Sequence, residues 1–284
     1  MGTASPSTRL SCATHCGRGI QAAAALAWRE WIRFVRQRNR VIGAAVQPVV
    51  FWLLFGAGLG PSFSLPGEAT ADVSYFQYFF PGTLLLILLF AAIFTTISII
   101  EDRREGFLQS VLVAPLPRWS MVAGKLLGGT MIALVHAIPF LVLGLVTSGI
   151  FISVFQLFAV LLWLGLVGLQ MVALGFSLAW RMSSVQGFHA IMNLLLMPMW
   201  LLSGAFFPVT TGPLRFVAII NPLSYSLSVL RRLFYLDATP AIRDMMIAGL
   251  PTMTLSICVT LIVTFLACVM AWILAKGRST GEQP

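Results

Sequence analysis

The most promising catalytic pattern in this sequence is a Gly-Lys pair, Gly124-Lys125. In a phosphate-binding loop, such a pair follows another glycine by five positions and precedes Ser or Thr. The loop backbone and the lysine then hold phosphates, and the hydroxyl holds Mg²⁺. Here no glycine lies five positions before Gly124, and Leu126 follows the lysine. The HExxH and GxSxG patterns are also absent. We therefore predict no catalytic residues and no cofactor bound by this chain, so any ATP would be hydrolysed by another chain.

Metal-binding residue types are few. Cys12, His15 and Cys16 could supply part of a metal site, but they lack a matching second pair, so a disordered tail is the favoured interpretation. His136 and His189 each stand alone in apolar surroundings. A histidine inside a membrane is a functional candidate, yet without a paired carboxylate a helix-helix hydrogen bond is favoured for both. We predict no metal site.

One charged segment, residues 101–118, contains a short amphipathic pattern, EDRREGFLQSVLVAPLPR. Its apolar residues repeat on one helical face at Phe107, Leu108, Val111 and Leu112. Pro115 and Pro117 should end the helix, because proline cannot continue it and restricts the residue before it. An exposed apolar face needs a partner. From these residues alone, that partner is either another protein, or lipid headgroups and the rest of this chain.

The elements around this segment are membrane spans. The chain has 284 residues, 58% of them hydrophobic and 10% charged, whereas about 25% is usual for a soluble domain. A helix needs about 20 apolar residues to cross the hydrocarbon core. We predict six spans, at about residues 41–60, 79–100, 126–148, 151–180, 188–207 and 250–275. Gly56 with Gly60, and Gly124 with Gly128, have GxxxG spacing, which in a chain this rich in glycine indicates plain packing.

The distribution of basic residues predicts the orientation. With both termini in the cytoplasm, 14 of the 18 Lys and Arg residues face that side, as the positive-inside rule requires. Residues 101–118 then lie in the cytoplasm. The other four, Arg215, Arg231, Arg232 and Arg243, fall in residues 208–249 on the outer side. That segment has two short apolar helical patterns separated by Asn221-Pro222, and each is too short to span, so we predict re-entrant or interfacial helices.

Residues 21–40 carry two helical stripes ahead of the first span. One stripe is basic and includes Arg29, Arg33, Arg36 and Arg40, and the other contains Trp28 and Trp31. Tryptophan at headgroup depth, with arginine toward anionic lipid, is typical of a helix lying in the membrane plane. We therefore predict an interfacial helix; a basic flank that only fixes topology is the alternative. Residues 1–20 and 278–284 are predicted tails around a single membrane domain, residues 21–277.

Three segments resemble the permeases of type-2 ABC exporters. The run EGFLQSVLVAPLPR is similar to their coupling-helix signature, and Gln47-Pro48 leads into the first span as it does in that family. The family typically continues with Ser-Gly, aromatic-Pro, Asn-Pro-Leu and a later Arg. Here these are Ser203-Gly204, Phe207-Pro208, Asn221-Pro222-Leu223 and Arg231. The resemblance covers about residues 21–277 and is greatest to the drug-resistance, nodulation-factor and polysaccharide export branch.

The resemblance implies an all-α fold with six transmembrane helices, an N-terminal interfacial helix, a cytoplasmic coupling helix, and re-entrant helices between spans five and six. It also implies two permease subunits, identical or different, and two separate ATP-binding ABC subunits. The implied ATPase-coupling residues are Glu101, Arg104, Glu105, Gly106, Leu108, Gln109, Val111, Leu112 and Pro115. The family usually has Glu where this chain has Gln109. The implied re-entrant residues are Gly204, Phe207, Pro208, Asn221, Pro222 and Arg231.

The function expected on this basis is outward transport of an amphiphilic cargo (a drug, a lipid or a lipid-linked glycan) across the bacterial inner membrane. Membrane lipids are expected partners and nucleic acid is not. A secondary transporter is the alternative. That class usually places acidic residues or broken, symmetry-related helices at the midplane, and no acidic residue lies inside a predicted span. A membrane-embedded enzyme is a third hypothesis, which the missing catalytic patterns disfavour.

Overall fold

The computed structural model of the chain describes residues 6–59, 74–114, 116–209 and 212–277. These residues form helices and turns, and no strand occurs among them. Six helices are long and apolar enough to cross a membrane, which confirms the predicted fold class and number of spans. They are α2 (Arg38–Leu59), α3 (Tyr75–Arg104), α5 (Arg118–Ser148), α6 (Val154–Ala179), α7 (Val185–Trp200) with its π-helical continuation η2 (Leu201–Ala205), and α11 (Met253–Gly277).

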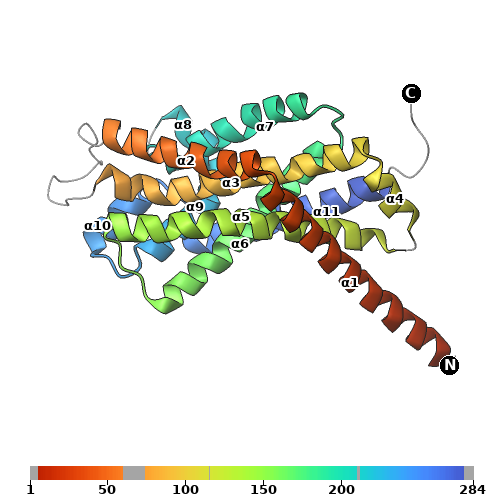
Figure 1. Ribbon diagram of the computed structural model, residues 1–284. Coiled ribbons are helices and arrows are strands. Elements are labelled where there is room, and N and C mark those ends of the chain that lie inside the picture. Colours follow the sequence, from red (N-terminus) through yellow and green to blue (C-terminus); the bar gives the residue numbers. More distant parts are fainter. Residues whose placement is uncertain (1–5, 60–73, 115, 210–211, 278–284) are drawn as a thin grey trace.

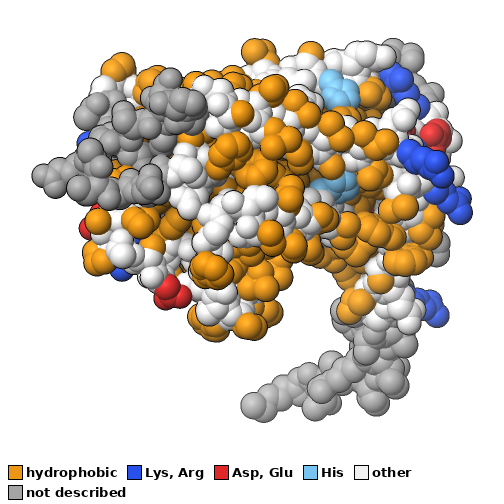
Figure 2. Space-filling view, turned by 60° about the vertical axis from the view of Figure 1, so that its left-hand side comes forward, with side chains coloured by type: hydrophobic (Ala, Val, Ile, Leu, Met, Phe, Trp, Pro, Cys, Tyr) orange, Lys and Arg blue, Asp and Glu red, His pale blue; other side chains and the backbone are white. Residues whose placement is uncertain are grey.

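The spans lie side by side in one bundle, with the short helix α4 (Phe107–Val113) at one end and α10 (Pro240–Ile247) at the other (Figure 1). Helix α1 (Pro6–Arg36) crosses the bundle obliquely, and the end of α11 approaches the α4 end. There the Arg118 guanidinium donates a hydrogen bond to the Lys276 carbonyl, at 2.7 Å. Figure 2 shows hydrophobic side chains across the middle of one face and Lys and Arg side chains gathered toward one end.

Helix α3 is the centre of the bundle. In its most apolar 18-residue stretch, 94% of the residues are buried, and α2, α5, α6 and α7 all pack against it. A helix that is hydrophobic on every side is stable in such a position because each side has a neighbour. A capping box begins the helix, in which the Ser74 hydroxyl accepts from the Gln77 N–H and the Gln77 side chain accepts from the Ser74 N–H.

Helix α1 begins earlier than the sequence suggested. The prediction gave a disordered tail over residues 1–20, whereas the structure has α1 in place from Pro6 onward. Proline is well suited to the first turn of a helix, and no further proline interrupts the segment before Arg36. The predicted helix at residues 21–40 is therefore the second half of α1 and the start of α2, with a break only at Gln37.

Between η2 and α11 the chain forms two short helices at a sharp angle. Helices α8 (Pro213–Ile220) and α9 (Pro222–Phe234) are bent by 86° at Asn221. The Asn221 side chain accepts a hydrogen bond from the Leu223 N–H at 3.0 Å, and Pro222 occupies the first turn of α9, so the sequence both ends one helix and starts the next. This geometry fits either a broken span or a re-entrant loop, and the re-entrant placement stays a prediction.

Candidate functional site: a charged cluster beside α4

Helix α1 crosses α5 at a pair of glycines. A Cβ atom added at Gly124 would lie 2.8 Å from the Ala23 carbonyl oxygen, and one added at Gly128 would lie 3.1 Å from the Cα of Ala27. The two backbones therefore almost touch, which only small residues on both helices permit. The Gly124–Gly128 spacing, interpreted from sequence as plain packing, is the site at which α1 docks. This contact brings Glu30 over the α5 surface.

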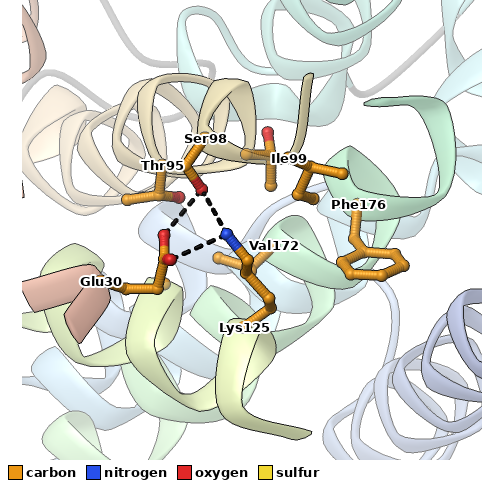
Figure 3. A pocket seen from close by; sticks show the side chains of 9 residues that line it. Glu30, Thr95, Ser98, Ile99, Lys125, Val172 and Phe176 are labelled. Atoms are coloured by element: carbon orange, nitrogen blue, oxygen red, sulfur yellow. Dashed lines mark hydrogen bonds and ion pairs between the residues drawn. The ribbon is translucent and has the colours of Figure 1, made fainter. Parts of the chain in front are cut away.

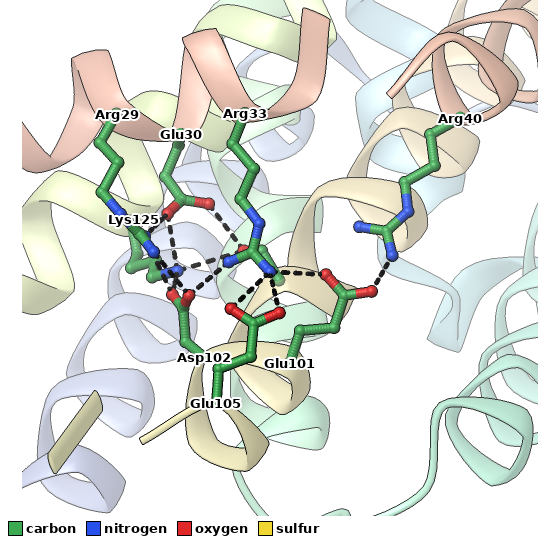
Figure 4. A network of polar contacts seen from close by, with 9 residues as sticks. Arg29, Glu30, Arg33, Arg40, Glu101, Asp102, Glu105 and Lys125 are labelled. Atoms are coloured by element: carbon green, nitrogen blue, oxygen red, sulfur yellow. Dashed lines mark hydrogen bonds and ion pairs between the residues drawn. The ribbon is translucent and has the colours of Figure 1, made fainter. Parts of the chain in front are cut away.

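Eight charged side chains meet where α1, α2, α3 and α5 approach the α4 end of the bundle (Figure 4). Four are carboxylates and four are cations, so the cluster is neutral as a whole. Every member has an oppositely charged partner. The carboxylates are Glu30, Glu101, Asp102 and Glu105, and the cations are Arg29, Arg33, Arg40 and Lys125.

The deepest part of the cluster joins α1, α3 and α5. Asp102 is fully buried, and Glu30 and Lys125 are each 6% exposed. The Lys125 ammonium contacts both carboxylates, at 2.8 Å from Glu30, and also donates to the Ser98 hydroxyl at 3.2 Å. That hydroxyl in turn donates to Glu30 at 2.7 Å (Figure 3). Buried charges need such pairing, because leaving one of them alone would cost several kcal/mol, roughly 3–5.

Arg33 links the cluster along the last turns of α3. Its guanidinium forms ion pairs with Glu101 at 3.0 Å, with Glu105 at 3.2 Å and with Asp102. Burial alone would lower the pKa of Arg33, but these three carboxylates outweigh burial and raise the pKa above its ordinary value. Arg33 is therefore a permanent charge that ties α1 to α3. Arg40, at the start of α2, pairs with the other oxygen of Glu101.

Helix α4 is attached to this cluster at its first residue. Gly106, with a φ of 76°, allows the chain to turn from α3 into α4. The Arg29 guanidinium lies over the Phe107 ring, 3.5 Å from its centroid, while also pairing with Asp102 at 3.0 Å. One cation of α1 thus contacts both the end of α3 and the start of α4.

The faces of α4 differ from the prediction in one respect. Leu108 is only 5% exposed and belongs to the core of this chain, and Val111 packs against that core. These residues, predicted to face an ATPase, face their own protein instead because the α3 end and its neighbours cover them. Gln109 and Ser110 are exposed, and Val113 is 86% exposed. The side chain of Leu112 and all of Pro115 lie outside the described residues.

Arg103 and Arg104 leave α3 toward the turn between α6 and α7. Arg103 donates to the carbonyls of Trp180 and Met182 at 2.5 and 3.2 Å, and Arg104 donates twice to the Ser183 carbonyl at 3.1 and 2.6 Å. Cations near the last carbonyls of a helix satisfy groups that lack partners within it. Arg104, predicted to act with α4, is placed on this turn, whereas Glu101 and Glu105 join the charged cluster.

The predicted interfacial stripe of arginines divides into two groups. Arg29, Arg33 and Arg40 form ion pairs with carboxylates of α3, whereas the prediction had them facing anionic lipid. The competing attraction is a set of three acidic residues close together at the end of α3. Arg36 is exposed, Trp28 is 60% exposed and Trp31 is half-buried, so these residues remain available to the surroundings. A membrane-plane position for α1 stays a prediction.

Sequence reasoning missed three members of the cluster, Glu30, Asp102 and Lys125. A usable signal was present, since Glu30 is the only acidic residue before position 68 and lies in an otherwise basic segment. An isolated carboxylate of that kind indicates a specific partner. Lys125 stands next to an apolar run, where a charge also needs one.

The predicted residues of the broken segment gather around a buried arginine. Arg231, 1% exposed, donates to the carbonyls of Gly204 at 2.9 Å, Met246 at 3.2 Å and Tyr78 at 3.3 Å. It also lies over the Tyr78 ring, 4.0 Å from the centroid. Gly204 has a φ of 87°, which opens the helix at η2 and frees its carbonyl. This clamp holds α9 to α3 and η2, and it explains one of the four arginines on the predicted outer side.

The remaining predicted residues of this segment lie close by. Asn221 donates a side-chain hydrogen bond to the Met199 carbonyl, which ties the bend between α8 and α9 to the end of α7. Phe207 and Pro208 are half-buried in the turn after η2, and Phe207 contacts the Phe206 ring. The structure thus brings Gly204 and Arg231 into contact and places the other residues of this segment around the same break.

The histidines make local contacts. His136 Nδ1 lies 2.8 Å from the Ile132 carbonyl of its own helix, so the predicted bond to a neighbouring helix is not formed by this atom. His189 packs edge-on against Phe94. Among the residues that the structure describes, no three His, Cys, Asp or Glu side chains could hold a metal ion together. The side chains of Cys12, His15 and Cys16 lie outside that part.

Comparisons of the sequence with known proteins identify its family. Residues 21–235 match the model of the family described as "ABC-2 type transporter". The daunorubicin resistance ABC transporter permease protein DrrB1 of Streptomyces coeruleorubidus is 24% identical over 245 residues, covering 80% of this chain and 81% of that protein. Nodulation protein J of Rhizobium leguminosarum bv. viciae is 28% identical over 203 residues, covering 67% and 73%. The chain belongs to the ABC-2 type transporter family and is a multi-pass membrane permease of an ABC transporter.

Proposed function

We propose that this permease is the membrane subunit of an ATP-driven exporter, and that a separate ABC ATPase binds the exposed side of α4. The observation that carries the proposal is the support beneath α4. Arg29 and the core around Leu108 hold one side of the helix, while Gln109, Ser110 and Val113 face outward. A short helix held firmly on one side and open on the other is suited to receive a force from a partner and pass it to the spans.

The charged cluster provides the path for that force. It connects α4 through Arg29 to α1, and through Asp102 and Lys125 to α3 and α5. Because α3 packs against four other spans, a displacement at its end reaches most of the bundle. Through this cluster, movement of the ATPase against α4 would be passed on to the spans that form the transport pathway.

A secondary transporter is the less favoured function. Its coupling residues would lie near the middle of the membrane, whereas the buried carboxylates found here, Glu30 and Asp102, lie at the α4 end and are held by cations. The placement supports a structural joint rather than a proton or sodium carrier.

A second permease subunit, identical or different, completes the proposed transporter. Gly43 of α2 and His189 of α7 both contact Phe94 of α3, so these two spans flank the same side of the central helix. One turn further along are Gln47 and Asn193, both exposed on spans. Exposed amides are unfavourable in hydrocarbon, so this side is suited to a polar pathway between two subunits.

The proposed cargo is amphiphilic, and the proposed location is the bacterial inner membrane with both termini in the cytoplasm. The names of the relatives, daunorubicin resistance and nodulation, support outward transport of such compounds. The gathering of basic side chains toward one end (Figure 2) supports that orientation.

The test is reconstitution in lipid vesicles with an ABC ATPase encoded beside this chain. The permease alone should not hydrolyse ATP, and the pair should hydrolyse ATP faster than the ATPase alone and move a fluorescent amphiphile such as daunorubicin. Rapid ATP turnover by the purified permease, or transport driven by a proton gradient without ATP, would contradict the proposal.

A further inference from the structure

An open groove runs along the side of the bundle where α1, α2 and α5 meet. One part has a volume of about 420 Å³ and lies against Trp31, Val35 and Arg38. The adjoining part has a volume of about 320 Å³ and continues past Ala45 to Leu143. Both parts are lined by Val41, Val135 and His136, so they form one continuous surface, here called the elbow groove. Each volume lies in the range of small-molecule sites, about 300–1,000 Å³.

The elbow groove is apolar along almost its whole length. Its lining is polar only at Arg38 and His136, and His136 already has a contact between Nδ1 and the Ile132 carbonyl. The wall is formed by apolar side chains of the spans α2, α3 and α5, together with Trp31, Phe34 and Val35 of α1. An apolar groove on the side of a spanning bundle is suited to hydrocarbon, since water would leave these side chains unfavourably hydrated.

The charge at one end of the groove indicates which headgroup a bound lipid would carry. Arg38 lines that end, and Arg36 lies two residues before it at the end of α1. Both are exposed, and neither has a carboxylate within ion-pair distance among the described residues. In contrast, Arg29, Arg33 and Arg40 are all paired. The end of a span is also the depth at which phospholipid phosphates lie.

We propose that the elbow groove binds one anionic phospholipid of the bilayer, with its phosphate at Arg36 and Arg38 and an acyl chain between α2 and α5. A second copy of this chain fits the charges less well. The exposed acidic side chains of the described part are Glu105, Asp237 and Asp244. Glu105 already pairs with Arg33, and the other two belong to the α10 end, away from the groove.

The bound lipid has a defined consequence for the charged cluster. It occupies the corner between the α1–α2 junction and α5, next to the helix that carries Arg29, Glu30 and Arg33. It therefore stabilises α1 in its docked position. This role concerns the permease itself and requires neither the ATPase nor any transport.

The test is lipid binding to the purified permease, followed by native mass spectrometry during titration with phosphatidylglycerol or phosphatidylcholine. We expect tighter binding of phosphatidylglycerol. Arg36→Gln and Arg38→Gln should each weaken it about fivefold, because each basic residue contributes modestly near an anionic surface. Ala45→Phe should weaken both lipids by filling the groove. Matched controls are Arg181→Gln, at an exposed arginine in the α6–α7 turn, and Leu162→Phe, at a residue of α6 that is 60% exposed.

Each result decides the proposal. Equal binding of the two lipids, or equal losses in Arg181→Gln and Arg38→Gln, would overturn it, because the effect would then be general surface charge. Unchanged binding in Ala45→Phe would show that the lipid binds elsewhere and would overturn the proposal.

A Val135→Cys variant covers the case in which Ala45→Phe does not fold. Efficient cross-linking of two copies through the introduced thiol would assign the groove to protein, whereas labelling by a photoreactive phosphatidylglycerol supports the proposal.

Discussion

The guanidinium carbon of Arg29 lies 3.5 Å from the centre of the Phe107 ring, and the same guanidinium pairs with Asp102. Residues far apart in the sequence thus form a three-way joint between α1, α3 and α4. A cation over an aromatic face, together with an ion pair, resists both sliding and separation. Movement of α4 therefore has to be shared by α1 and α3, and this makes the joint the natural place to test the mechanism.

The two sides of α4 should respond differently to substitution. Val113→Asp changes a side chain that is 86% exposed, so the fold should be retained while association with the ATPase falls, because an apolar contact is lost. Leu108→Ala removes a core side chain and should destabilise the permease by about 2–4 kcal/mol. Pull-down of the ATPase and thermal unfolding in detergent separate the two effects.

A matched control for Val113→Asp is Val154→Asp, at a residue that is 85% exposed at the start of α6 and away from α4. Equal loss of ATPase binding in both variants would remove the special role of α4. Normal unfolding of Leu108→Ala would contradict the core position of Leu108.

The close crossing of α1 and α5 should not tolerate a side chain at Gly124, even one as small as a methyl group. Gly124→Ala places a methyl group 2.8 Å from the Ala23 carbonyl, so α1 must shift or detach, at a cost of about 1–3 kcal/mol. Limited proteolysis should then cut α1 more readily. Gly58→Ala is the control, because a Cβ there meets nothing within 4 Å. Equal proteolysis of both variants and the wild type would show that the crossing is looser than the structure indicates.

The spans were predictable because their signal is the length of an apolar run. The membrane requires about 20 such residues whatever the neighbours are, and α2, α3, α6 and α11 agree with the predicted segments to within a few residues at most ends. The start of α5 did not follow from this rule. Its first turns, from Arg118 to Lys125, are stabilised by contacts with α1 and with Asp102 rather than by hydropathy.

The charged cluster was not predictable for a related reason. Hydropathy and the positive-inside rule count charges without pairing them, and pairing here joins residues up to 95 positions apart, as Lys125 and Glu30 are. The orientation of the apolar face of α4 was not predictable for the same reason. Periodicity identified its apolar face but not whether that face turns toward a partner or toward the chain itself, which depends on how α3 ends.

The buried lysine should be needed to hold two carboxylates together. Lys125→Met removes the most buried cation that contacts both Glu30 and Asp102 and leaves Arg29, which is 31% exposed, as their shared partner. The free energy of unfolding should therefore fall, by at most about 3–5 kcal/mol. Lys125→Met combined with Glu30→Gln should recover part of the loss, because one negative charge is removed as well. Denaturant unfolding in detergent measures both. Arg243→Met, which affects an exposed pair at 3.9 Å, should change stability by no more than about 1 kcal/mol. A double variant less stable than Lys125→Met would contradict this account.

The contribution of Arg231 to stability should depend on the several N–H donors of its guanidinium group and not only on its positive charge. It reaches three carbonyl oxygens on three different elements through two separate nitrogens. The three donors of a lysine ammonium all radiate from one nitrogen and cannot reproduce this spread, so Arg231→Lys should release at least one carbonyl. A buried carbonyl left without a donor costs about 1–3 kcal/mol, so we expect a loss of that size.

The neighbour Arg232 is half-buried and donates to the Pro251 carbonyl at 3.0 Å and to the Ser228 hydroxyl at 3.4 Å. Arg232→Lys therefore makes the same chemical change where water can replace a lost donor, and it should cost less. Thermal unfolding of the two variants, together with hydrogen exchange of η2 around Gly204, distinguishes the outcomes. If both variants lost equal stability, or if exchange near Gly204 stayed at the wild-type rate in Arg231→Lys, the clamp would not be what holds α9 against η2.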